Sequence, residues 1–304
     1  MGTGTAPKAP RIAVFGVPTA AGTGRAGSER APFVLREAGL LDALRATGAR
    51  VVNLSDLSLF PYRDDPEHPT ARNAAVVACA VRTAADETTR ALAEGFTVVL
   101  GGDCTLAAGV VGGAGKALGR PVGLIAVDGN ADLNTPETTP SGLLTGMAFA
   151  LAMGQGPEEV TSAVGVHVAP EHVAVLAFRD LDPGERGRLD GIALALPATA
   201  ARRLGMRVTA ALALDAIENE DGPIVVHFDV DAIDPAEMPA SDPPTPGPGL
   251  SLAEVSDLVT ALVGAPRAVA LVVAGYHPDL DPERVHARQI VDLIARAVAR
   301  RMRS

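Results

Sequence analysis

Residues 121–134, PVGLIAVDGNADLN, carry a row of polar side chains directly after a short apolar run. Alternate positions hold Asp128, Asn130, Asp132 and Asn134. A second apolar run leads into a row with the same spacing, His227, Asp229 and Asp231. In an extended segment alternate residues share one face, so each row would present its side chains to one side. Carboxylates this close repel one another unless a cation or proton lies between them, and divalent cations with oxygen ligands are the usual solution.

Polar residues follow other apolar runs as well. GGDC ends in Asp103 and Cys104, RDLD occupies 179–182, and GYHPD occupies 275–279. Because ligands of a parallel α/β sheet bind beyond the carboxyl ends of its strands, these segments predict one convergent polar site built from distant parts of the chain. The alternative role of such aspartates, capping helices or fixing turns, stays open, above all for Asp103 and Asp234.

Short apolar runs alternate with longer helical patterns. The expected strands are 11–16, 50–53, 97–100, 122–127, 173–178, 224–228 and 268–274. The expected helices are 30–48, 71–95, 104–118, 142–153, 198–218, 251–263 and 283–302. Near-continuous Val, Ile and Leu strands separated by amphipathic helices indicate a parallel sheet covered on both faces. We therefore expect an α/β fold over residues 1–304, a single-domain three-layer α/β/α arrangement with a mostly parallel central sheet, in which 1–9 are flexible.

Composition and charge argue against several classes of partner. The 304 residues are 47% hydrophobic and carry a net charge of −10, whereas nucleic-acid binding needs concentrated Lys and Arg. No run of eighteen apolar residues exists, so we expect no membrane span. Two cysteines do not suggest a disulfide framework, and the first residues lack an apolar signal region, so we expect a cytoplasmic protein. The Pro-rich stretch 239–249 is long enough to form a site wall or an oligomer contact.

Five segments together resemble the ureohydrolase family, which comprises arginase, agmatinase and formiminoglutamase. They are IAVFGVPTAAGTGRAGSERAPFVLREAGL, VVLGGDCTLAAG, VDGNADLNTPETTPSGLLTGM, FRDLDPGE and HFDVDAIDPAEMPA. The resemblance covers nearly the whole chain and implies an arginase-like fold and a homo-oligomer. It also implies two manganese ions that activate a hydroxide for attack on a guanidinium-type carbon of a small molecule.

Site residues follow from the same resemblance, position by position. The implied metal ligands are Cys104, Asp128, Asn130, Asp132, Asp229 and Asp231. The implied contacts to an amino-acid end of the substrate are Asn134, Thr139, Ser141 and Asp182. The candidate catalytic residues are Asp132, His227 and Thr145. His227 is chosen for its register with Asp229 and Asp231, and Thr145 because it occupies the position of a family histidine that assists proton transfer or substrate contact.

The chain departs from the family pattern at several of these positions. The family has histidine at Cys104 and at Asn130, and arginases have asparagine at Leu143 and a guanidinium-binding glutamate at Gly275. An amide oxygen is a weak ligand compared with imidazole, and Cys104 is either a thiolate ligand that favours softer ions such as zinc or a small buried hydrophobe. We therefore expect metal binding that is weakened, limited to one site or absent. His227 and His277 are candidates to compensate.

Three functions remain open from the residues. The first is a divergent metal-dependent hydrolase that cleaves a C–N bond of a small guanidino, amidino or modified amino-acid substrate. The second is an inactive relative retained as a binding or scaffold subunit. The third is a repurposed metal-independent enzyme of a specialised biosynthetic pathway. A dinucleotide site at GTGRAG, residues 22–27, lacks the strand–turn–helix context that such a motif needs.

Overall fold

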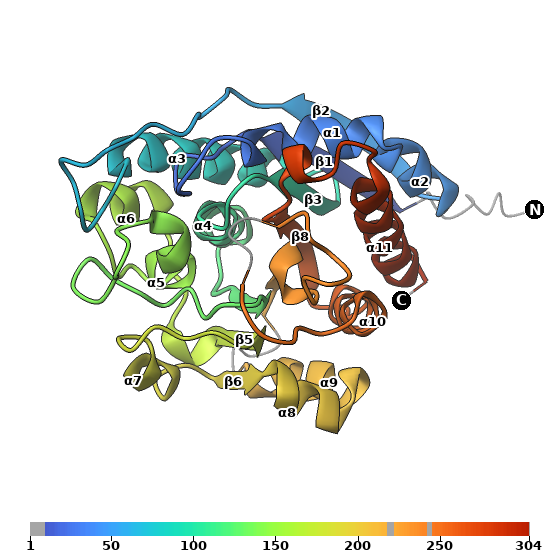
Figure 1. The fold of residues 1–304 in the computed structure, drawn as a ribbon. Coiled ribbons are helices and arrows are strands. Elements are labelled where there is room, and N and C mark those ends of the chain that lie inside the picture. Colours follow the sequence, from blue (N-terminus) through green and yellow to red (C-terminus); the bar gives the residue numbers. More distant parts are fainter. Residues whose placement is uncertain (1–9, 218–221, 242–244, 304) are drawn as a thin grey trace, which may run out of the picture.

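The computed structural model describes residues 10–217, 222–241 and 245–303. In this part of the chain eight strands form one sheet in the order β2-β1-β3-β8-β7-β4-β5-β6, and every pairing between neighbours is parallel (Figure 1). The strands are β1 (Arg11–Val17), β2 (Arg50–Asp56), β3 (Phe96–Gly101), β4 (Gly123–Val127), β5 (Val173–Phe178), β6 (Leu194–Pro197), β7 (Ile224–Asp229) and β8 (Ala268–Ala274). The expectation of a largely parallel sheet is confirmed.

Eleven α-helices accompany these strands in the described residues. They are α1 (Ala31–Glu37), α2 (Leu40–Ala46), α3 (Ala74–Ala91), α4 (Leu106–Leu118), α5 (Ala148–Ala152), α6 (Glu158–Val164), α7 (Arg186–Leu189), α8 (Ala198–Leu204), α9 (Met206–Ala216), α10 (Leu252–Val263) and α11 (Val285–Arg301). None of the helices described is long and apolar enough to cross a membrane.

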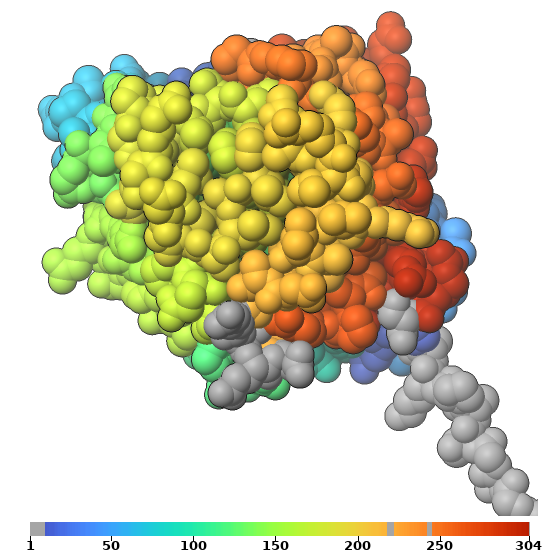
Figure 2. Space-filling view, turned by 90° about the horizontal axis from the view of Figure 1, so that it is seen from below, coloured from blue at the N-terminus to red at the C-terminus, as the bar shows by residue number. Residues whose placement is uncertain are grey.

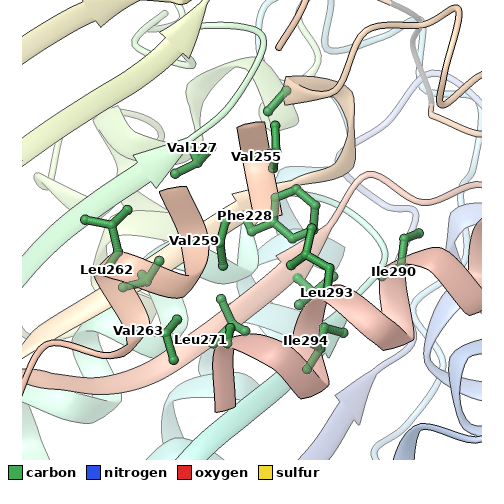
Figure 3. Close-up of a cluster of buried hydrophobic side chains, with 14 of the residues drawn as sticks. Val127, Phe228, Val255, Val259, Leu262, Val263, Leu271, Ile290, Leu293 and Ile294 are labelled. Atoms are coloured by element: carbon green, nitrogen blue, oxygen red, sulfur yellow. The ribbon is translucent and has the colours of Figure 1, made fainter. Parts of the chain in front are cut away.

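Helices cover both faces of the sheet because the inner strands are apolar on both sides. One face packs against α1, α2 and α8–α11, and the other packs against α3–α6. Figure 3 shows the first of these layers, where Phe228 of β7 meets α10 and α11. Alternation along β7 sends His227 and Asp229 to the opposite face, toward α5. At the β6 edge, α7–α9 cover the sheet, as the space-filling view in Figure 2 shows in yellow.

Several element boundaries differ from the sequence prediction. The expected helix 30–48 is broken at Gly39, whose φ is 96°, and the expected helix 198–218 is broken at Gly205, whose φ is 81°. Glycine adopts these left-handed angles without the cost that a Cβ brings, so the chain turns there. The expected helix 142–153 starts two residues later as a 3₁₀ turn, Leu144–Met147, that leads into α5. Strand β6 and helices α6 and α7 were not predicted, and all three are short.

Two sequence expectations fall wholly or partly outside the described residues. The flexibility of 1–9 is one, and the Pro-rich stretch 239–249 is partly the other, since 242–244 are not described. Its described remainder contributes one side chain to the site considered next, that of Thr245.

Candidate functional site

The carboxyl ends of β3, β4, β5 and β7 surround a cavity of about 140 Å³. Ten of the residues singled out in the sequence line it: Cys104, Asp128, Asn130, Asp132, Asn134, Ser141, Thr145, Asp182, Asp229 and Asp231. Leu143, Asp180 and Glu185 complete much of the remaining wall. Residues up to 127 positions apart in the chain therefore meet at one end of the sheet, as expected for a parallel α/β fold.

The row from Asp128 to Asn134 reaches the cavity by a route that the alternation did not anticipate. Strand β4 ends at Val127, and the backbone N–H of Asn130 donates to Oδ1 of Asp128 at 2.8 Å, which closes a turn. Asp132 then adopts a left-handed φ of 49°, an uncommon conformation for a residue with a Cβ. The four side chains share the site because the loop turns, so the assumption of continued extension was wrong.

Four residues form a group that we call the inner cluster: Cys104, Asp128, His227 and Asp229. Each offers a ligand atom, and these four atoms all lie within 4.8 Å of one another. The Cys104 thiol donates to Oδ2 of Asp229 over 2.7 Å, and His227 Nε2 lies 3.7 Å from Oδ2 of Asp128. His227 is fully buried and meets the ring of Phe149 edge to face, with centroids 5.3 Å apart.

Several polar atoms of the inner cluster have no hydrogen-bond partner among the residues described. They are Oδ2 of Asp128 and both ring nitrogens of His227. Buried polar atoms in proteins are nearly always paired, so three orphans in one cluster indicate a missing ligand or a functional constraint.

Burial dominates the electrostatics of these acids. It raises the pKa of Asp128, Asp132 and Asp229 well above the usual range, and the carboxylates raise one another's pKa further. Burial and the neighbouring aspartates also raise the pKa of the Cys104 thiol, and burial lowers the pKa of His227 to about 3. In the absence of a cation the cluster therefore favours protonated acids, a neutral imidazole and a thiol.

A second group, the outer cluster, consists of Asn130, Asp231 and Thr245. The Asn130 amide donates to Oδ2 of Asp231 at 2.8 Å, and the Thr245 hydroxyl makes a short hydrogen bond to the same oxygen. The backbone N–H of Gly129 donates to the other oxygen, Oδ1, at 2.8 Å. Asn130 Nδ2 also lies 2.9 Å from Thr245 Oγ1. Every carboxylate oxygen in this group accepts hydrogen bonds from the protein itself.

The rim of the cavity is held by hydrogen bonds between two loops. Asn134 Nδ2 donates to Oδ2 of Asp182 at 2.7 Å. Glu185 accepts from the backbone N–H groups of Leu133 and Asp182, at 2.8 and 2.9 Å, and so fixes the loop after β4 to the loop after β5. The Asn134–Asp182 pair is thus positioned to meet a polar group of a bound molecule.

Other sequence candidates lie at or beyond the cavity edge. Thr145 lines the cavity, and its hydroxyl oxygen accepts from the backbone N–H of Cys104 at 3.4 Å. Thr139 is not among the lining residues, and its hydroxyl oxygen accepts from the N–H groups of Ser141 and Gly142 within a turn. His277 is buried away from the lining, where its ring lies 3.2 Å from the carbonyl of Ala26.

Asp103 and Asp234, for which a role in turns was open, both hold backbone. Asp103 accepts from the N–H groups of Gly22 and Thr105, at 3.1 and 3.0 Å, and from the side chains of Thr19 and Thr105. Asp234 accepts from the N–H groups of Ala236 and Gly249. Neither lines the cavity.

Gly275 has a φ of 78°, and a Cβ at this position would collide with Oδ1 of Asp229. The carboxylate of Asp229 thus occupies the space into which any side chain at 275 would begin. The residue types alone show that the glutamate implied by the resemblance is absent at position 275. They do not show that the Asp229 carboxylate fills the space beside it.

Two site residues were not found from the sequence. Glu185 lies in the quoted FRDLDPGE segment, three residues after Asp182, and its acidic type was the available signal. Thr245 lies fourteen residues beyond Asp231 in the Pro-rich stretch, and only the suspicion that this stretch forms a site wall pointed to it.

Comparison with known proteins agrees with the fold. The model of the arginase family matches residues 10–300. An arginase of Brucella melitensis is 32% identical over 94% of this chain and 95% of that protein. Crystal structures of arginases from Bacillus subtilis and Bacillus caldovelox superpose with TM-scores of 0.83 and 0.84, at 28% and 26% identity, and each comparison covers 95% of this chain and 98% of the other. The chain belongs to the arginase family.

Proposed function

We propose that this chain is a metal-dependent hydrolase that cleaves a C–N bond of a small guanidino, amidino or modified amino-acid compound, with a metal site altered from the family pattern. The observation that carries the proposal is the group of buried carboxylates, Asp128, Asp132 and Asp229, that face one cavity with no cationic side chain among its lining residues. Such a group is stabilised by a divalent cation.

The residues present fit a cation in the inner cluster better than in the outer one. In the inner cluster, ligand atoms of Asp128 and His227 have no hydrogen-bond partner among the described residues, whereas Asp231 already accepts three hydrogen bonds. A divalent cation at this edge would lower the pKa of a water molecule and polarise the carbon that is attacked. Asp132 faces the same cavity and is placed to accept or return a proton, and the Thr145 hydroxyl offers a further polar contact.

The cavity favours a compact substrate. Its volume of about 140 Å³ is well below the roughly 300–1,000 Å³ of pockets for drug-sized ligands. Asn134, Ser141 and Asp182 offer amide, hydroxyl and carboxylate groups to one end of a bound molecule, while Leu143 and Gly275 provide no polar side chain. Free L-arginine is therefore a poor substrate in this proposal, and a shorter or modified relative is preferred.

The test is a substrate screen on chelator-treated protein reloaded separately with Mn²⁺, Zn²⁺ and Co²⁺. Guanidino and amidino compounds of increasing length, with and without an α-amino acid end, are assayed for release of urea, ammonia or formamide. We expect turnover of at least one compound, and we expect Asp132→Asn to abolish it. Asp257→Asn on the surface of α10 is the matched control, since Asp257 pairs with Arg296 far from the cavity.

Metal uptake without hydrolysis of any compound would contradict the proposal and favour a binding or scaffold subunit. Turnover by rigorously metal-free protein would favour the metal-independent reading instead. We also expect a homo-oligomer, and the exposed apolar side chains of Leu204, Val208 and Leu212 on α8 and α9 support a contact there. Light scattering on the eluting protein measures its mass directly.

A further inference from the structure

We propose that the inner cluster is a mononuclear site for a thiophilic cation, with Zn²⁺ preferred, and that Cys104, Asp128, His227 and Asp229 are its ligands. The inference deepens the proposed function and rests on it for the use of the ion, while binding of the ion is measured without any substrate. It departs from the ligand set that the resemblance implies, because it adds His227 and leaves out Asn130, Asp132 and Asp231.

The spacing of the donor atoms suits one ion. Zinc binds thiolate sulfur at about 2.3 Å and imidazole nitrogen at about 2.0–2.1 Å in tetrahedral geometry, so neighbouring ligand atoms lie about 3.5 Å apart. In the inner cluster the two measured separations are 2.7 Å, from Cys104 Sγ to Asp229 Oδ2, and 3.7 Å, from His227 Nε2 to Asp128 Oδ2. The largest separation within the group is 4.8 Å or less. The four atoms therefore lie close enough together to hold one ion.

His227 is the observation that singles out this site. Its side chain is 0% exposed, and neither ring nitrogen has a hydrogen-bond partner in the described part of the chain. Its position in β7 is fixed by pairing with Ala126 of β4 and Val272 of β8, and its ring plane is fixed by the edge contact with Phe149. A buried imidazole normally has a partner for at least one nitrogen. His227 Nε2 lies 3.7 Å from Oδ2 of Asp128, which also has no hydrogen-bond partner among the described residues.

Cys104 determines which ion is preferred. A thiolate favours Zn²⁺ and Co²⁺ over Mn²⁺, which is better served by carboxylate, carbonyl and water. In the structure the thiol proton lies between Cys104 Sγ and Asp229 Oδ2, and coordination replaces this proton with the cation and releases it to solvent. Cysteine, histidine and aspartate are each ligands that zinc takes in proteins, and four of them satisfy its tetrahedral preference.

The hydrogen bonds of the outer cluster argue against a second ion there. The amide nitrogen of Asn130 and the hydroxyl of Thr245 both donate to Oδ2 of Asp231, and Gly129 donates to Oδ1. A carboxylate with this many donors has little need of a cation. The Asn130 amide is turned toward Asp231 with its donor, not its acceptor.

The experiment uses the full chain, stripped with chelator and titrated with Co²⁺, which reports its ligands by absorption. We expect one equivalent to bind, with a sulfur-to-cobalt charge-transfer band in the near ultraviolet and the intense visible bands of four-coordination. Cys104→Ser is expected to remove the near-ultraviolet band, and Cys79→Ser, at the exposed cysteine, to leave it unchanged.

Histidine ligation has its own matched pair of variants. Loss of a group that only orients a ligand typically costs 10–100-fold in metal affinity, so we expect His227→Gln to weaken binding by at least about tenfold. The exposed His68 pairs with Asp65 away from the site, and His68→Gln is expected to bind as the wild type does. Asn130→Ala is expected to keep the single-ion affinity, because Asn130 is outside the ligand set.

X-ray absorption on zinc-loaded wild-type protein keeps the inference testable if His227→Gln does not fold. One sulfur at about 2.3 Å together with imidazole scattering supports it. Three results would overturn it. They are bound cobalt without a thiolate band, an unchanged metal affinity in a folded His227→Gln protein, and metal binding that depends on Asn130. A thiolate-ligated ion in a protein that hydrolyses no guanidino or amidino compound would end the proposed function and leave this site standing. Manganese-supported hydrolysis without sulfur ligation would do the reverse.

Discussion

The inner and outer clusters lie at neighbouring ends of the same strands, yet they solve the problem of buried charge differently. Asp231 in the outer cluster receives hydrogen bonds from an amide, a hydroxyl and a backbone N–H. Asp128 in the inner cluster keeps one oxygen without a partner in the described structure, close to an imidazole that has none either. The outer cluster is complete as it stands, and the inner cluster is complete only with a cation or with protons.

The difference teaches how the residue types at these positions decide where buried acids need a cation. Asparagine at 130, where the family resemblance implies a histidine ligand, donates a hydrogen bond to Asp231 and so lessens the need for an ion there. Cysteine at 104 keeps an atom that can bind a metal, and His227 brings an imidazole nitrogen into the same group. Two histidines that the family resemblance implies as metal ligands are absent here, and an imidazole is present at position 227.

The largest expected effect comes from adding a side chain at Gly275. Gly275 has a φ of 78°, and a Cβ there would collide with Asp229. Because an alanine would combine a left-handed backbone with overpacking, Gly275→Ala should lower the free energy of unfolding by about 2–5 kcal/mol. Gly48→Ala is the matched control, because Gly48 has a φ of 88° but nothing within 4 Å of a Cβ. It should lose about 1 kcal/mol.

Denaturant unfolding of both variants measures the difference. If the Asp229 carboxylate is the obstacle, the double change Asp229→Ala and Gly275→Ala should lower the free energy of unfolding by less than the sum of the two single changes. Strict additivity would mean that Asp229 does not occupy the space beside Gly275.

Next in size is a pair of changes with opposite signs in metal-free protein. Asp231→Asn replaces the charged acceptor of three hydrogen bonds and should lower the unfolding free energy by about 1–3 kcal/mol. Asp128→Asn removes a buried acid whose pKa is raised by burial and by Asp132, and should raise stability. Equal destabilisation by both changes would remove the distinction between the clusters. Loading with Zn²⁺ should reverse the sign for Asp128→Asn alone.

The pH dependence of His227 gives a third effect. Its pKa falls from 6.5 to about 3 on folding, so the folded state resists the protonation that the unfolded chain accepts. The contribution of the neutral, buried ring to the free energy of unfolding is fully present above pH 6.5 and is lost as the pH falls from 6.5 toward 3. Between pH 7 and pH 5 metal-free wild type should lose about 2 kcal/mol relative to His227→Gln. Parallel stability curves for the two proteins would show a ring that can take up a proton while folded.

The smallest expected effect is a partial return to the family pattern. Asn130→His together with Cys104→His should raise manganese affinity by about tenfold, or 1.4 kcal/mol, because imidazole is the stronger ligand. The single change Cys104→His should alter only the inner cluster. Isothermal titration gives both affinity and stoichiometry, and no gain in manganese binding by the double variant would show that the positions do not correspond to those of the family.

Sequence patterns predicted most of the polar residues that line the cavity, but not the hydrogen bonds between them. Apolar runs ending in acids identified the strand ends correctly because parallel strands deliver their carboxyl ends to one edge. The alternation from Asp128 to Asn134 misjudged the backbone, since Asp132 has a positive φ that no pattern of residue types reveals. The contact of Thr245 with Asp231 depends on how a fourteen-residue excursion returns, and that is set by tertiary packing. Short elements such as β6 were missed because four half-buried residues give too little periodicity.

The position of β8 in the sheet governs when the site can exist at all. This strand, the last of those described, lies between β3 and β7, so the two parts of the sheet that carry Cys104 and Asp229 are joined only through residues 268–274. On a ribosome the N-terminal strands emerge well before the strand that unites them, and such distant pairing is slow to form. The newly made chain therefore keeps Cys104 apart from Asp229 until synthesis is nearly finished, although β4 and β7, which carry the acids, pair directly with each other. If the inner cluster binds a metal ion as proposed, capture of that ion is one of the last events of maturation.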